Sequence, residues 1–474
     1  MTPSERFRKI CVWVGIAVVA LGAVLLQRQR SDADAASASD EGGFVEDRPD
    51  APGTSDIAPA TLETQLAAKM TVALHALAPT TDAAQLLGQV ERGRNGAFAD
   101  RLGYCVLVGS FDGWDRGVAQ AQEIALPEDA VDEAKAMRDH VIAAMRARVE
   151  ERALSADESE ALESLRPTMG YFVDVLGPDA VAKGAATTAV LIAAGLWYVG
   201  AFFVGLAALA VLAVLCGGGK LRPIFVPAAS SHAAVVLGET FLLWITLFLT
   251  LNVLAAVVAA PFVAQLGGAG SLLVSVAVMF SSLAALAYPA SRGIHWAELR
   301  RLIGLHAGAG FVREALHGVV CYLCAVPLLV AGLVVFAILS AISEAVAGDA
   351  APPSHPVVEL FADAGVLQVC ALFLLASVTA PIVEEIAFRG LLYGHLRGVV
   401  APRVRLISMI IAAVASSAVF AVIHPQGVLF VPALGGLAVG FCLYREMRSS
   451  LVAPMVAHGL NNAVTLTIGL TLMS

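Results

Sequence analysis

The sequence predicts an all-α protein, a polytopic bundle of about nine membrane-spanning helices with an extramembrane helical domain inserted after the first span. Two observations support this fold class. Of the 474 residues, 58% are hydrophobic and only 15% are charged, which is a larger apolar share and a smaller charged share than soluble domains have. The apolar residues also gather in runs of roughly 18 to 25, the length that crosses about 30 Å of hydrocarbon at about 1.5 Å per helical residue.

The first apolar run, near residues 11–27, follows basic residues at the N-terminus. Arg28 and Arg30 come directly after it, with no small-residue cleavage site beside the run. We therefore expect a retained signal anchor over residues 1–30. Residues 31–60 are rich in Ser, Asp, Ala, Gly and Pro, a composition that predicts a flexible acidic linker.

A small helical domain is predicted over residues 61–183, because Ala, Leu, Val and Met recur there at spacings of three and four. The segment contains no cluster of side chains that suggests chemistry. We expect an extracytoplasmic domain with a structural role, and the alternative is a domain that docks a protein partner or regulates the rest of the chain.

Eight more apolar runs predict the remaining spans. Those within residues 184–345 are transmembrane helices to which the sequence assigns no role. The eight runs lie near residues 186–216, 233–262, 271–290, 316–342, 366–388, 405–424, 427–444 and 451–471.

Charge is distributed unevenly along the chain. Residues 31–183 contain 28 Asp and Glu against 13 Lys and Arg, whereas the rest of the chain is net basic. This acidity argues against a nucleic-acid partner, which requires a basic surface. With nine spans and a cytoplasmic N-terminus, the Lys and Arg residues of the short loops fall on the cytoplasmic side. We expect a multi-pass protein of a bacterial inner membrane, with residues 31–183 outside.

Polar residues lie at depth in three of the late runs, where a central Asp, Lys or Arg costs about 2.5 to 3.5 kcal/mol on insertion scales. Most of the other runs contain none. The residues are Glu384, Glu385 and Arg389 with the sixth run, His424 at the end of the seventh, and His458, Asn461 and Asn462 in the ninth.

Helical spacing separates the roles of these residues, since side chains four apart share a face. Glu385 can pair with Arg389, which leaves Glu384 available, and His458 and Asn462 present two polar groups to one cavity. Peptide hydrolysis needs a base for water, a group that polarises the carbonyl and an acid for the leaving amine. Each residue also has a simpler interpretation, a hydrogen bond between helices.

Three short segments resemble, in order, the motifs of the CAAX-protease and bacteriocin-processing (CPBP) family of intramembrane proteases. Residues 384–389 (EEIAFR) resemble its EExxxR motif, residues 420–424 (FAVIH) its FxxxH motif, and residues 458–462 (HGLNN) its HxxxN motif. The resemblance covers roughly residues 366–471 and implies a protease core over 346–474, or from near 316. It implies a catalytic centre of Glu384, His424, His458 and Asn462, with Glu385 and Arg389 as the supporting pair.

Two mechanisms remain open within this resemblance. In the metal version, Glu384, His424 and His458 hold Zn²⁺ with a water molecule in the fourth position. In the metal-free version, Glu384 and His424 activate water while His458 and Asn462 stabilise the oxyanion. The metal-free version is slightly favoured, because Asn is a poor zinc ligand and the HExxH pattern is absent.

The depth of His424 presents a difficulty. In a straight helix from Arg405 it lies about 28 Å along the axis, farther than Glu384 is expected to lie. A helix break near Pro425, or a sixth helix that continues past Arg397, would bring the two side chains together. Arg397 and the neighbouring His395 are expected at the cytoplasmic surface.

The resemblance implies CAAX-protease-like hydrolysis of peptide bonds in membrane-associated substrates, such as bacteriocin precursors or other membrane peptides, in contact with the lipid bilayer. Prenylated CAAX substrates are not expected in a bacterial inner membrane. Two other functions are alternatives. One is a catalytically silent immunity or binding protein on the same fold, and the other is an ion-coupled transporter. Transport predicts paired spans interrupted by Gly or Pro in inverted repeats, which the sequence does not show convincingly.

Overall fold

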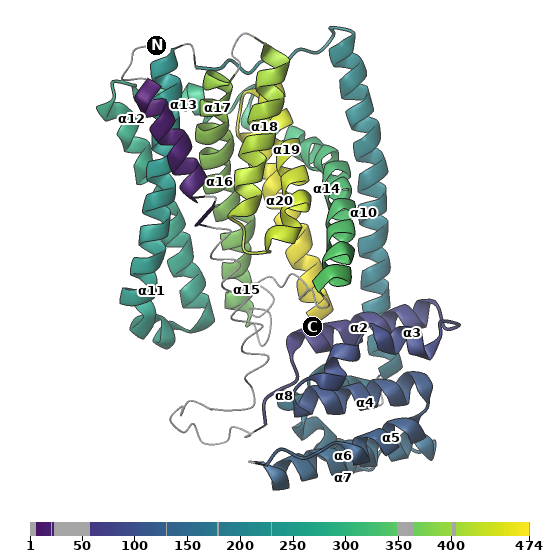
Figure 1. The fold of residues 1–474 in the computed structure, drawn as a ribbon. Helices are drawn as coiled ribbons and strands as arrows, with labels where there is room; N and C mark the ends of the chain where they lie inside the picture. The colour runs from purple at the N-terminus through teal and green to yellow at the C-terminus, as the bar shows by residue number, and fades with distance from the viewer. Residues whose placement is uncertain are drawn as a thin grey trace. The chain divides into compact units, whose positions relative to one another are not determined.

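The computed structural model describes residues 6–19, 21–22, 57–128, 130–177, 180–228, 230–347, 365–400 and 404–473. By its internal contacts the chain divides into two compact units. One unit, the bundle, comprises Met1–Phe44 and Trp197–Thr467, and the other, the helical unit, comprises Val45–Leu196 and Ile468–Ser474. The described residues form helices and no strand (Figure 1). The predicted all-α membrane bundle is therefore confirmed.

Seven helical stretches of the described chain are long and apolar enough to cross a membrane. Each corresponds to one of the predicted runs, with edges that differ by up to about ten residues. The seven are Ala185–Gly217, Ser231–Val257, Gly267–Ser291, Phe311–Ser343, Val366–Val399, Arg405–Val422 and Val428–Arg448.

The two other predicted runs, 11–27 and 451–471, are not among the seven. Residues 11–19 and 21–22 of the first run belong to a helix that begins at residue 6, and the other residues of this run lie outside the described residues. The second is helix α20 (Val452–Met473), which is long enough to span but is made less apolar by its His and Asn residues. Ala453 and Ala457 of α20 are nevertheless fully buried in the bundle core.

The N-terminal helix packs against the bundle through both apolar and charged side chains. Val12 and Ile16 belong to the largest buried cluster, and the Arg8 guanidinium donates to both carboxylate oxygens of Glu239. Lys9 donates to the carbonyl oxygen of Val399. The acidic linker predicted for residues 31–60 lies, except for residues 57–60, outside the described residues.

The helical unit surrounds a core of its own, which includes Leu102, Val106 and Phe172. Gly117 lets two of its helices approach, since a Cβ there would lie 2.7 Å from the carbonyl oxygen of Cys105. The elements are α2 (Leu62–Leu77), α3 (Ala83–Gly88), η1 (Glu91–Asn95), α4 (Phe98–Asp112), α5 (Trp114–Glu123), α6 (Val131–Val149), α7 (Ala156–Ser164), α8 (Arg166–Met169) and α9 (Tyr171–Leu176).

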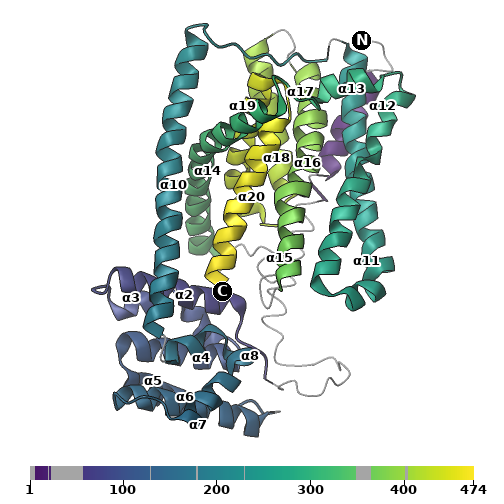
Figure 2. The ribbon, with the colours of Figure 1, turned by 180° about the vertical axis from the view of Figure 1, so that it is seen from behind.

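The first half of the bundle contains long apolar helices. Helix α11 folds back on itself at Gly267, whose backbone is non-helical (φ 66°), so that its two arms run side by side in both views (Figures 1 and 2). The elements are α10 (Ala180–Gly217), which continues from the helical unit, α11 (Ser231–Ser282), η2 (Leu283–Ala287), α12 (Tyr288–Ser291), α13 (Trp296–Ile303) and α14 (Phe311–Ala347).

Helix α14 and helix α19 (Val431–Arg448) cross closely because glycines line their contact. A Cβ on Gly332 would lie 2.2 Å from the carbonyl oxygen of Pro432, and one on Gly436 would lie 2.2 Å from that of Leu328. Gly440, four residues after Gly436, packs on Ala325 in the same way. Small residues at this spacing are typical of helices that associate within membranes.

The sixth span is one continuous helical stretch of 34 residues, Val366–Val399. It comprises α15 (Val366–Phe373), a π-helical segment η4 (Leu374–Thr379), α16 (Ala380–Glu385), a second π-helical segment η5 (Ile386–Leu392) and α17 (Tyr393–Val399). π-Helical turns recur at functional sites. Both polar residues of the EE pair stand on α16, between the two π segments.

Candidate active site

Three helices and one loop bring the predicted site residues together. Glu384 and Glu385 are the last residues of α16. His424 follows the end of α18 (Arg405–Val422) by two residues, and His458 stands on α20. These helices lie next to one another in the bundle (Figures 1 and 2).

The depth difficulty is resolved by the length of the sixth helix. It continues to Val399, as one of the two expected solutions requires, and α18 also ends before His424. Glu384 therefore lies about 22 Å from the Val399 end of its helix. That depth is close to the depth of His424, which follows the end of the antiparallel helix α18.

One oxygen atom, Oε2 of Glu384, lies at the centre of the site. It is 3.7 Å from Nε2 of His424 and 3.8 Å from Nε2 of His458. This oxygen is buried and accepts no hydrogen bond from any described residue. The side chains of Glu384 and His424 are 16% and 19% exposed, so the site is not sealed.

The hydrogen-bond partners of the two histidines assign their tautomers. Nδ1 of His424 lies 2.6 Å from the carbonyl oxygen of Phe420, which can only accept, so Nδ1 carries a proton. Nδ1 of His458 lies 3.0 Å from a carboxylate oxygen of Glu385 and donates to it. In their neutral forms both rings therefore turn an unprotonated Nε2 toward Glu384. Three acceptor atoms converge on one point, which favours a water molecule or a cation between them.

Glu385 and Arg389 form the predicted pair and also orient His458. Arg389 donates from Nη1 to Oε1 of Glu385 at 2.8 Å, and both side chains are fully buried. The same Oε1 accepts from His458. The guanidinium lies between the rings of Phe420 and Phe441, with its central carbon 4.6 and 5.1 Å from their centroids.

Comparison with known proteins agrees with the motifs. Residues 366–464 match the family model of the type II CAAX prenyl endopeptidase Rce1-like proteins. We refer to residues 366–464, which have this similarity, as the Rce1-like domain. Over 86 residues, 18% of this chain, the sequence is 33% identical to the membrane-embedded CAAX protease MroQ of Staphylococcus aureus (strain USA300). The match spans 34% of MroQ, about a third of its length. No solved structure matches the chain significantly.

The Rce1-like domain uses its asparagines differently from the two histidines. Nδ2 of Asn462 donates to the carbonyl oxygen of Ala376 at 2.7 Å, and Asn461 donates to Oδ1 of Asn462. In the π segment Ala380 donates to Leu375, five residues earlier, so the next donor in that register would be Pro381, which has no N–H. Asn462 therefore donates its hydrogen bond to a backbone carbonyl oxygen that receives none from the helix itself, rather than to Glu384.

The residue types around Glu384 fit Zn²⁺, because one carboxylate and two imidazole nitrogens can supply three lone pairs. Their spacing is wider than a zinc shell, in which bonds of about 2.0–2.1 Å separate neighbouring ligands by roughly 3.3 Å. Within the described part of the chain, no group of three His, Cys, Asp or Glu residues is placed to hold a metal ion.

Two features of the Rce1-like domain were missed or misplaced by the sequence analysis. His395 and Arg397 were expected at the surface, but they are 0% and 2% exposed. Arg397 pairs with Glu446 of α19, and Tyr393 donates to the same carboxylate at 2.7 Å. Glu446 follows the predicted run 427–444 and stands between Arg445 and Arg448, so the sequence contained no signal of this second buried pair.

Proposed function

We propose that the Rce1-like domain is an intramembrane endopeptidase and that Glu384, His424 and His458 carry the reaction. The observation that supports this proposal is the convergence of the two histidine Nε2 atoms on a buried oxygen of Glu384 that accepts no hydrogen bond from a described residue. A helix-to-helix hydrogen bond would have satisfied that oxygen. Burying an oxygen atom without a hydrogen bond is energetically costly, and atoms buried in this way typically contact substrate or water.

In the proposed step, Glu384 removes a proton from a water molecule held with His424, and the water oxygen attacks the peptide carbonyl carbon. Nδ1 of His458 donates to the Glu385 carboxylate, whereas Nδ1 of His424 donates to a neutral carbonyl oxygen. The carboxylate stabilises a doubly protonated His458, which can then donate a hydrogen bond from Nε2 to the oxyanion. Glu384 then returns its proton to the leaving amine as the C–N bond breaks. One acid and one amine are released.

Asn462 acts in this proposal by positioning, since its amide ties α20 to the π segment that precedes Glu384. If the site takes Zn²⁺, Glu384, His424 and His458 would hold it, and the ion would supply an activated water. The substrates we propose are peptides or proteins of the membrane, because the reacting groups stand on or directly after long helices of an apolar bundle. Processing of bacteriocin or CAAX-type precursors belongs to this class.

The test is cleavage of a quenched membrane-peptide library by the purified full chain in detergent. Glu384→Gln keeps the size of the side chain and removes the base, so we expect activity to fall by at least about 10²-fold. Glu298→Gln, on the exposed surface of α13, is the matched control and should retain activity.

A zinc chelator distinguishes the two mechanisms, since only a metal-dependent wild type loses activity in it. Cleavage that survives in Glu384→Gln at the control level would contradict the proposal. Folded wild-type protein without cleavage of any peptide would favour the silent binding or immunity function instead.

A further inference from the structure

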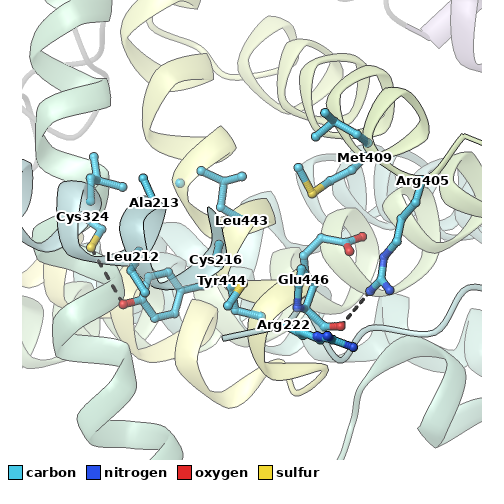
Figure 3. A pocket seen from close by; sticks show the side chains of 15 residues that line it. Leu212, Ala213, Cys216, Arg222, Cys324, Arg405, Met409, Leu443, Tyr444 and Glu446 are labelled. Atoms are coloured by element: carbon cyan, nitrogen blue, oxygen red, sulfur yellow. Dashed lines mark hydrogen bonds between the residues drawn. The ribbon is translucent and has the colours of Figure 1, made fainter. Parts of the chain in front are cut away.

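A second site lies in the bundle, away from Glu384. It is a cavity of about 700 Å³ lined mainly by residues of α10, α14, α18 and α19. Apolar side chains make up most of its wall (Figure 3). They include Leu212 and Ala213 of α10, Cys324 of α14, Met409 of α18, and Leu443 and Met447 of α19.

The cavity is distinct from the candidate active site. Met409 precedes His424 by fifteen residues on nearly the whole length of α18, which separates them by about 22 Å. The cavity lies where α10 ends at Gly217, α18 begins at Arg405 and α19 ends at Arg448. The ends of spanning helices are at the level of the lipid headgroups.

The charged groups at the cavity favour an anion. Arg222 is exposed, and among the described residues no carboxylate pairs with it or with Arg405. Arg405 donates only to the backbone carbonyls of Pro223 and Phe225 (Figure 3). The third charged group, Glu446, is already paired with Arg397. Two uncompensated guanidinium groups therefore stand beside an apolar hollow.

We propose that this cavity binds an anionic phospholipid of the bilayer, with an acyl chain along the apolar wall and the phosphate at Arg222 and Arg405. A basic pocket between spanning helices is a recurrent form of anionic-lipid site. The volume is in the range of ligand pockets that enclose most of a small molecule. A free phosphate would leave the apolar wall uncovered, and a neutral lipid would leave the two arginines without a counter-ion.

The experiment is native mass spectrometry of the delipidated full chain, titrated with phosphatidylglycerol or with phosphatidylcholine of the same acyl chains. We expect tighter binding of phosphatidylglycerol. Arg222→Ala should weaken it about fivefold, the effect of one basic residue near an anionic headgroup. Arg301→Ala removes an exposed arginine of α13 that does not line the cavity, and it should leave binding unchanged.

Ala213→Trp tests the apolar wall, because the larger ring would occupy the hollow. We expect it to reduce binding of both lipids. Equal affinity for the two lipids, or equal loss in Arg222→Ala and Arg301→Ala, would overturn the assignment of the anionic headgroup. Unchanged phosphatidylglycerol binding in Ala213→Trp would overturn the assignment of the cavity.

Discussion

Two acid–arginine pairs with the same spacing of four residues show how differently the two units of this protein use charge. In the helical unit, Asp112 and Arg116 pair with side chains that are 34% and 67% exposed. In the Rce1-like domain, Glu385 and Arg389 pair with both side chains fully buried. An exposed pair contributes little to stability, whereas a buried pair is retained against a large desolvation cost.

The difference supports the proposed location of the active site. The helical unit keeps its ion pairs on the surface around an apolar core, and its buried carboxylate, Asp100, accepts from the backbone N–H of Thr61. The Rce1-like domain buries Glu385, Arg389 and His458 in one connected cluster beside Oε2 of Glu384, which accepts no hydrogen bond from a described residue. Burial of connected polar groups without full satisfaction is expected at a reacting site rather than in a structural core.

The largest expected effect comes from removing the acid of the buried pair. Glu385→Gln leaves Arg389 buried without a counter-ion and removes the acceptor that orients His458. We expect about 3–5 kcal/mol of destabilisation together with loss of cleavage. Asp112→Asn, the matched change on the surface, should leave stability and cleavage unchanged. Thermal unfolding of the full chain in detergent and the peptide assay measure the two effects.

This contrast would fail in either of two ways. Glu385→Gln with wild-type stability would mean that the remaining contacts of Arg389, such as its hydrogen bond to the carbonyl oxygen of Ala438 at 3.3 Å, are sufficient to keep it buried. A strong effect of Asp112→Asn would mean that the surface of the helical unit contributes more than exposed pairs normally do.

How much could be predicted from the sequence follows the same division. The candidate site residues in the late runs were predictable, because polar and charged residues at membrane depth are costly. Glu384 and His458 are therefore conspicuous in an apolar context. The contact of Glu385 with His458 was not predictable, since it depends on how α16 and α20 meet. The hydrogen bond that the side-chain amide of Asn462 donates to the carbonyl oxygen of Ala376 depends on a π-helical register that no residue pattern indicates.

In the helical unit the spacing of apolar residues predicted helices but no helix-to-helix contact. One close crossing of its helices depends on Gly117, and one close crossing in the bundle depends on Gly436. A glycine in a helical pattern has several interpretations, including caps and kinks. The crossings became identifiable only when both backbones were in place.

An intermediate effect is expected from alanine at these two crossings. A Cβ on Gly436 would lie 2.2 Å from the carbonyl oxygen of Leu328, and one on Gly117 2.7 Å from that of Cys105. Each helix must shift, which typically costs about 1–3 kcal/mol, and the shorter contact should cost more. Thermal unfolding and hydrogen exchange of peptides from each unit locate the change.

The controls for the crossings are glycines of the same two units at which an added Cβ would have no atom within 4 Å. These are Gly435 in α19 and Gly88 in α3. Alanine there should be neutral or slightly stabilising, because it restricts the unfolded chain. Equal destabilisation by Gly435→Ala and Gly436→Ala would show that helix propensity, and not the close approach of α14, governs this part of the bundle.

The smallest expected effect lies on the surface of the helical unit, at the start of α7. Glu158 accepts from Arg152 and from the backbone N–H of Ser155, and these bonds lower its pKa to about 2. Its contribution is therefore complete above its ordinary pKa near 4.5 and is lost as the pH falls toward 2. Glu158→Gln should speed hydrogen exchange of residues 156–164 in the full chain at pH 7, with a mutant-to-wild-type ratio that shrinks toward one at pH 2. Glu160→Gln on the same helix should show no such trend, and a ratio independent of pH for Glu158→Gln would mean that its carboxylate charge contributes nothing here.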